Sequence, residues 1–127
     1  MAKTLLIDTD VLIDYLRELP PAVDYLESLE EELCTSSIAV AELYAGAREG
    51  KDRQGLDSLL SVFEIKPNDA GLAERGGLLR RDYAPKHGTG FADALIAATV
   101  QHCGAELVTL NARHFPMLHN VVVPYRK

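Results

Sequence analysis

The segment LLIDTDVLID, residues 5–14, places three carboxylates directly behind an apolar run. Asp8 ends that run, as expected if residues 5–7 form a strand that is buried on both faces of a parallel sheet. Ligand sites of such sheets lie at the carboxyl ends of the strands, so Asp8 is a candidate for chemistry. Asp10 is placed to cap or brace the helix that follows, and Asp14 is expected to face water.

Glu42 and Asp93 each place a carboxylate on an apolar background within a predicted helix. The residues three and four positions from Glu42 are small or apolar, so its carboxylate should leave from the buried face. Asp93 stands near the start of the apolar helix FADALIAATV in a similar way. The plainer interpretation of each acid is a lone salt bridge or, for Asp93, a favourable place in the first turn of a helix.

Carboxylates from separate elements would raise one another's pKa if they met without a counter-ion. Oxygen-ligated divalent cations remove this repulsion, and hard carboxylates without neighbouring His or Cys favour Mg²⁺ or Mn²⁺ over zinc. At the open edge of a sheet, such an ion suits the hydrolysis of a phosphodiester bond, because it activates water and neutralises the leaving oxygen. The residues predicted to hold the metal are Asp8, Glu42 and Asp93.

Strand and helix patterns alternate along the chain and predict an α/β layered fold with a mainly parallel sheet. Strands are expected at 5–7, 33–35, 62–65, 106–110 and 121–123. Helices are expected from Asp10 to just before Pro20 and over about 22–31, 36–48, 52–60, 69–83 and 91–102. The stretch 84–90, APKHGTG, is the most loop-like in the chain. Asn111 closes the fourth strand as Asp8 closes the first.

The totals favour one domain that spans residues 1–127, because the length and the 47% apolar content suit a single core. Cys34 and Cys103 lie far apart without metal-type spacing, and no long apolar run occurs, so a soluble cytoplasmic protein is expected, with no membrane contact. The net charge of −6 argues by itself against a binder of polyanions. Metal ions held among the acids would reverse that field locally.

In order and spacing, four motifs resemble the PIN-domain ribonucleases, and most closely the VapC-type toxins of bacterial toxin–antitoxin pairs. The motifs are LLIDTDVLIDYL, SSIAVAELYAGA, FADALIAAT and LVTLNARHF. The resemblance covers essentially the whole chain and implies a three-layer αβα sandwich with strand order 3-2-1-4-5. It also implies an endoribonuclease that depends on Mg²⁺ or Mn²⁺ and cuts a structured RNA such as tRNA. A small antitoxin is the implied protein partner, in a hetero-oligomer or beside a homodimer.

The catalytic residues implied by the resemblance are Asp8, Glu42, Asp93 and Asn111. Asp is frequent at the last of these positions, so Asn111 is a departure from the family pattern. An amide oxygen can still ligate a metal ion, but it carries no charge, so a second ion would need ligands from substrate phosphate. Thr9 and Thr109 match hydroxyl positions that line the family's site, and Asp10 stands where Asn is frequent.

Basic groups that neighbour the site elements are expected to meet the RNA backbone, although each could equally be a solvated face. They are Arg48, Lys51 and Arg53; Arg80, Arg81, Lys86 and His87; and Arg113 and His114. His114 is also a possible general base, which metal-activated water does not require. The apolar surface of residues 11–29 is expected to serve an antitoxin helix or a homodimer contact, or else to be plain core.

Two other functions fit part of the pattern. The sequence DTD at residues 8–10 resembles the nucleophile and acid of a haloacid-dehalogenase-like phosphatase, but the Lys and the late pair of acids such enzymes need are not evident. A phosphoacceptor receiver module has a similar length. It requires an acceptor Asp after a central third strand, where this chain has Ile65-Lys66-Pro67, and a Lys after the fifth strand, where Pro124 follows Val123.

Overall fold

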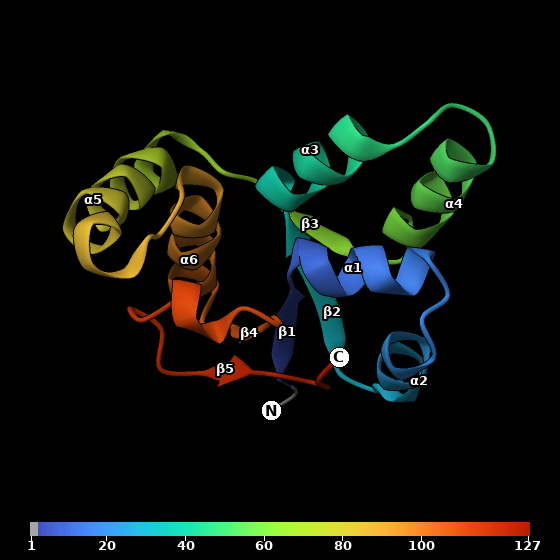
Figure 1. The fold of residues 1–127 in the computed structure, drawn as a ribbon. Helices are drawn as coiled ribbons and strands as arrows, with labels where there is room; N and C mark the ends of the chain where they lie inside the picture. Colours follow the sequence, from blue (N-terminus) through green and yellow to red (C-terminus); the bar gives the residue numbers. More distant parts are fainter. Residues whose placement is uncertain (1–2) are drawn as a thin grey trace.

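A five-stranded sheet with helices on both faces forms the protein, whose computed structural model describes residues 3–127 (Figure 1). The strands are β1 (Thr4–Ile7), β2 (Glu32–Ser36), β3 (Glu64–Lys66), β4 (Glu106–Val108) and β5 (Val121–Val122). Their order is β3-β2-β1-β4-β5, and all four pairings are parallel. The predicted α/β sandwich with strand order 3-2-1-4-5 is therefore confirmed.

Side-chain alternation along β1 divides the core into two parts, one on each face of the sheet. The helices are α1 (Thr9–Leu16), α2 (Pro20–Ser28), α3 (Ser37–Gly46), α4 (Lys51–Leu60), α5 (Ala70–His87) and α6 (Phe91–Cys103), with a 3₁₀ turn η1 (Ala112–His114). Leu6 packs in one cluster with α5 and α6, whereas Leu5 and Ile7 pack in another with residues of α1 to α4. Burial on both faces explains why β1 is continuously apolar.

The centre of the sheet positions the candidate site. β1 and β4 lie side by side, but β1 leads through α1 and α2 to β2 on one side and β4 leads to β5 on the other. The strand order therefore reverses between them, which is where open α/β sheets leave a crevice at the carboxyl ends of their strands. Asp8 and Thr109 are the residues that directly follow these two strands.

Two helix boundaries differ from the prediction. α5 continues through Pro85 to His87, although residues 84–90 read as a loop; Pro85 lacks the N–H for one helical hydrogen bond, and only two further residues of the helix follow it. The helix ends at Gly88, which adopts the left-handed conformation with φ 67°. At the start of α1 the N-cap is Asp8, whose carboxylate accepts the Thr9 N–H, whereas Asp10 lies inside the first turn.

The apolar residues of 11–29 form core in this structure. Val11, Leu12 and Leu26 are fully buried, and their apolar neighbours Tyr15 and Tyr25 are partly buried against the same cluster. The structure therefore supports plain core for the buried residues, and a partner contact of the partly buried ones stays a prediction. In the described part of the chain, no helix combines the length and the apolar character needed to cross a membrane.

The receiver interpretation does not agree with the sheet. β3 is an edge strand that pairs only with β2, so it is not the central strand on which a phosphoacceptor would stand. It ends at Lys66 and is followed by a proline, with no carboxylate at its carboxyl end. The acids of this chain gather instead where β1 meets β4.

Candidate active site

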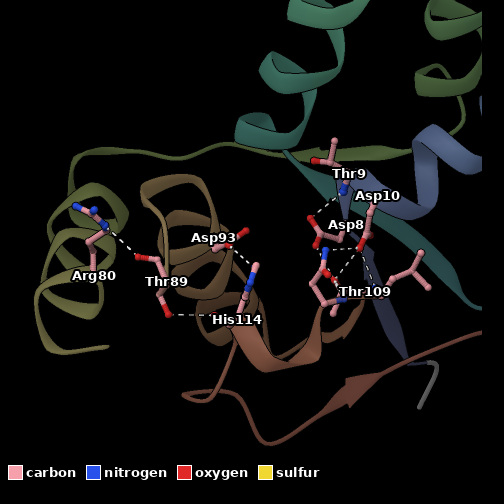
Figure 2. A network of polar contacts seen from close by, with 10 residues as sticks. Asp8, Thr9, Asp10, Arg80, Thr89, Asp93, Thr109 and His114 are labelled. Atoms are coloured by element: carbon pink, nitrogen blue, oxygen red, sulfur yellow. Dashed lines mark hydrogen bonds and ion pairs between the residues drawn. The ribbon is translucent and has the colours of Figure 1, made fainter. Parts of the chain in front are cut away.

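Asp8 is a buried carboxylate that pairs with no cation within residues 3–127 (Figure 2). One oxygen accepts the Thr9 N–H at 2.8 Å, and the other accepts the Thr109 hydroxyl at 2.7 Å. Among residues 3–127, no basic side chain forms an ion pair with it. Burial, and after it the charge of Asp10, raises the pKa of Asp8 to about 7. Ionised Asp8 therefore carries a charge that an added cation would stabilise.

Asp93 reaches the same edge of the sheet from the first turn of α6 (Figure 2). Its charge is among the causes of the raised pKa of Asp8, although the smallest of them. Partial burial raises the pKa of Asp93 itself, and His114 opposes this shift. The Nδ1 atom of His114 lies 3.3 Å from Oδ2 of Asp93. Two predicted ligands, from β1 and α6, thus share one environment.

Glu42 lies at the exposed rim of this site, so its predicted place on a buried helix face is wrong. The apolar residues around it mislead because α3 buries only a narrow stripe, formed by Ala39 and Leu43, and leaves Ala45 exposed. The carboxylate of Glu42 accepts the hydroxyl of Thr9 at 2.9 Å. Since the N–H of Thr9 is bonded to Asp8, this residue connects the two acids.

Asp10 fastens the loop after β4 to the start of α1, which confirms its predicted bracing role. One of its oxygens accepts the N–H of Val11 at 2.8 Å. The other accepts the N–H of Leu110 at 2.9 Å and the amide group of Asn111 at 3.2 Å. Both oxygens are therefore engaged by N–H donors. Because the amide nitrogen of exposed Asn111 faces Asp10, its amide oxygen is the atom left for a ligand.

Asp14 is buried, so the expectation that it faces water is wrong. It accepts the phenol hydroxyl of Tyr125 at 2.9 Å and lies 2.8 Å from the ammonium group of Lys127. Helical periodicity predicts the burial of Asp14, since it follows buried Val11 by three positions and so lies on the same face of α1. Nothing in the local sequence points to its two partners, which lie more than a hundred residues away.

The donor atoms at this edge of the sheet are compatible with a divalent metal ion. Within residues 3–127, no three His, Cys, Asp or Glu side chains form a ready-made metal cluster. The chemistry of the side chains nevertheless fits a hard cation, because Asp8, Asp93 and Glu42 offer only oxygen atoms. The raised pKa values of Asp8 and Asp93 mark negative charge that lacks full compensation. A cation between these two acids would relieve the penalty of burying them.

Most of the chain is similar in sequence to one family of known proteins. The family model of the PIN domain matches residues 5–117. Ribonuclease VapC10 of Mycobacterium tuberculosis strain H37Rv is 37% identical over 124 residues, which are 95% of this chain and 92% of the relative. Ribonuclease VapC19 of the same strain is 38% identical over 124 residues, 94% of this chain and 98% of the relative.

Solved structures with the same fold include proteins described with their partners. A toxin–antitoxin complex from Klebsiella pneumoniae contains a chain with a TM-score of 0.83 and 32% identity, which covers 97% of this chain and 99% of that chain. VapBC2 from Rickettsia felis, bound to a DNA fragment from its promoter, gives a TM-score of 0.76 and 27% identity, with 94% and 96% covered.

Proposed function

Because the chain belongs to the PIN-domain family and, within it, to the VapC-type ribonuclease toxins, we propose that it is an endoribonuclease that requires Mg²⁺ or Mn²⁺. Its substrate is a structured RNA such as a tRNA. The observation that carries the metal requirement is Asp8, a buried acid with a pKa of about 7 and no basic partner among the described residues. A dication supplies the missing positive charge and the Lewis acid that phosphodiester hydrolysis needs.

The metal ion is assigned to Asp8 and Asp93, with Glu42 and the amide oxygen of Asn111 as further donors at the rim. An ion held by these residues would supply the Lewis acid for activating water and for neutralising charge on the scissile phosphate. Asn111 replaces an acid of the family pattern without bringing charge of its own. One ion, held by Asp8 and Asp93 with Glu42 at the rim, is therefore the number we propose before substrate binds.

The surrounding polar groups orient these ligands. Thr109 is fully buried and donates to Asp8, which fixes the rotation of that carboxylate. His114 plays the equivalent part for Asp93 from the loop after β4. Asp10 secures that loop to α1 through the N–H of Leu110. The ligands are thereby held in place before substrate arrives, which limits the reorganisation needed during reaction.

We also propose that the partner protein is a small antitoxin and that the two form a hetero-oligomer. This proposal is supported by the solved neighbours, several of which are toxin–antitoxin complexes, some bound to DNA. Binding of such a partner would restrain the ribonuclease in the cell. Co-expression with the product of a neighbouring small gene, followed by co-purification, tests the assembly.

RNA cleavage by the isolated protein tests the enzyme assignment. We expect a tRNA pool to be cut in Mg²⁺ or Mn²⁺ and to stay intact in EDTA. Asp93→Asn should abolish cutting while the melting curve remains that of a folded protein. Asp82→Asn is the matched control, because Asp82 is an exposed acid that pairs with Arg81 on the surface, and it should cut normally. Cleavage that persists in Asp93→Asn would end the proposal.

A further inference from the structure

Phe91 is a large apolar side chain that is left 62% exposed at the start of α6, two residues before Asp93. The guanidinium group of Arg80 lies over its ring, 4.2 Å from the ring centroid. We propose that Phe91 and Arg80 form a platform on which an unpaired base of the RNA substrate stacks, at the start of the helix that carries Asp93. The proposal rests on the ribonuclease function proposed above and adds a substrate contact to it.

Arg80 is held in this position by its neighbours. Its Nε donates to the backbone oxygen of Thr89 at 3.0 Å, and no acid among residues 3–127 forms an ion pair with it. The side chain is half-buried, so its planar group stays against the ring. An arginine stacked on an aromatic face keeps its charge while it offers a flat surface.

A continuous series of contacts connects the platform to the carboxylates (Figure 2). The buried hydroxyl of Thr89 donates to the backbone oxygen of His114 at 3.2 Å, and the ring of His114 lies 3.3 Å from Asp93. The same Thr89 accepts from Arg80. The phenyl ring of Phe91, the guanidinium group of Arg80 and the carboxylate of Asp93 therefore have defined relative positions, as a substrate subsite requires.

The charges of the surface also favour this side for RNA. Of the expected basic groups, Arg48 and Arg53 are neutralised on the α3–α4 side by Asp52, Glu49 and Asp57, at 3.2 to 3.4 Å. Arg80, Lys86 and Arg113 have no such partner within residues 3–127, and on the α3–α4 side the same holds for Lys51 alone. In an acidic protein, a polyanion is attracted only where cations remain uncompensated.

An RNA base fits the platform better than a protein helix does. A docking helix needs a continuous apolar groove, whereas the exposed residues just before this ring, Lys86 and His87, are polar. Proteins that bind single-stranded RNA combine aromatic faces with Arg or Lys, and stacking tolerates any base. An unpaired loop nucleotide is therefore the occupant we assign to Phe91.

Binding of a fluorescein-labelled single-stranded RNA 12-mer tests the platform, with EDTA present to prevent cleavage and fluorescence anisotropy as the readout. Phe91→Ala should weaken binding about 10-fold, as expected for the loss of one stacked base. Phe91→Trp should bind as tightly as the unchanged protein. Val62→Ala removes another exposed apolar side chain, 73% exposed and remote from α6 in sequence, and should change nothing. A fully paired duplex of the same sequence should bind Phe91→Ala and the unchanged protein with equal affinity.

A second pair of variants separates stacking from general charge. Arg80→Ala should weaken binding and lower the salt dependence by about one phosphate contact, whereas Arg53→Ala, which removes a neutralised charge, should not. Arg80→Lys keeps the charge but loses the flat surface, and should recover only part of the affinity.

The failure of the stacking proposal can be told apart from the failure of the ribonuclease proposal. RNA affinity of Phe91→Ala equal to that of the unchanged protein overturns the platform and leaves the ring to a protein contact. Absence of measurable RNA binding by the unchanged protein overturns it equally. Neither result bears on whether the chain cuts RNA, because that is decided by the metal-dependent cleavage of tRNA and its loss in Asp93→Asn.

Discussion

Two buried carboxylates, Asp8 and Asp14, lie within six residues of one another at opposite ends of α1, yet their surroundings differ. Asp14 accepts a hydrogen bond from Tyr125 and pairs with the ammonium group of Lys127. Asp8 receives only an N–H and a hydroxyl, and its nearest charges are those of other acids. Burial is similar in the two cases, but within the described part of the chain only Asp14 has a counter-ion.

We interpret this difference as one between an acid with partners inside the fold and an acid that is available to a cation. A buried charge that has partners within the protein holds the segments of those partners in one relative position. A buried charge left uncompensated destabilises the folded state until a cation binds. Asp14 fits the first description and Asp8 the second. Substitutions at the two positions should therefore affect stability and RNA cleavage differently.

The largest expected effect is the loss of catalysis in Asp8→Asn. Partners that merely orient a metal ligand contribute 10- to 100-fold, so removal of a ligand itself should lower the rate of RNA cleavage about 1,000-fold. Asp14→Asn should retain cleavage within about tenfold of the unchanged protein, when both are assayed well below their melting temperatures in excess Mg²⁺. Comparable activity in the two variants would remove the contrast on which this interpretation depends.

The next effect is a fall in the stability of the metal-free protein as pH rises. The pKa of Asp8 lies near 7 in the folded state, above its ordinary value of 3.8, so the folded state holds its proton more tightly than the unfolded state. The resulting penalty is absent below about pH 4, develops as pH rises, and is complete above pH 7, where it is on the order of 4 kcal/mol. Asp10 and Asp93 act in the same direction.

Urea unfolding in EDTA at pH 5 and pH 8 measures this penalty. The free energy of unfolding should be lower at pH 8 by about 3 kcal/mol, and Asp8→Asn should remove most of that difference. Mg²⁺ should also reduce it, by binding only the folded state. Equal pH dependence in the unchanged protein and in Asp8→Asn would contradict the assignment of the buried charge to Asp8.

A smaller loss of stability is expected from Asp14→Ala. The substitution removes an ion pair and a hydrogen bond and leaves the Tyr125 hydroxyl without its acceptor, which should cost about 2 kcal/mol in the free energy of unfolding. Lys127 is largely exposed and can return to water, so the cost stays below that of a fully buried pair. Asp52→Ala, which breaks an exposed pair with Arg48, should cost less than about 0.5 kcal/mol. Equal costs for the two variants would argue against a structural role for Asp14.

The smallest effect in the series is that of Tyr125→Phe. Burial and then the hydrogen bond to Asp14 raise the pKa of the Tyr125 phenol well above its usual range, so the hydroxyl remains protonated and donates. Its removal should lower the free energy of unfolding by about 1 kcal/mol and leave RNA cleavage unchanged. A loss of cleavage at unchanged stability would instead connect the C-terminal segment to the active site.

The alternation of elements and the placement of Asp8 and Asp93 could be predicted from the sequence. A run that is apolar at every position implies a strand covered on both faces, and an acid directly after it stands at the ligand-binding edge of the sheet. The strand order followed from the resemblance carried by the four motifs. These features depend on residues close in sequence or on order along the chain, which is why they could be inferred without coordinates.

Which face of a helix is buried, and which distant partners its polar residues meet, was decided only by the tertiary structure. Glu42 lies on a helix that is apolar on several sides, so periodicity does not identify the side that packs on the sheet, and the prediction that Glu42 lies on the buried side is wrong. Asp14 meets Tyr125, and Asp93 meets His114, only after the sheet has brought their segments together. Local patterns report what a residue prefers, whereas the compensation of a buried charge depends on the packing of segments that are far apart along the chain.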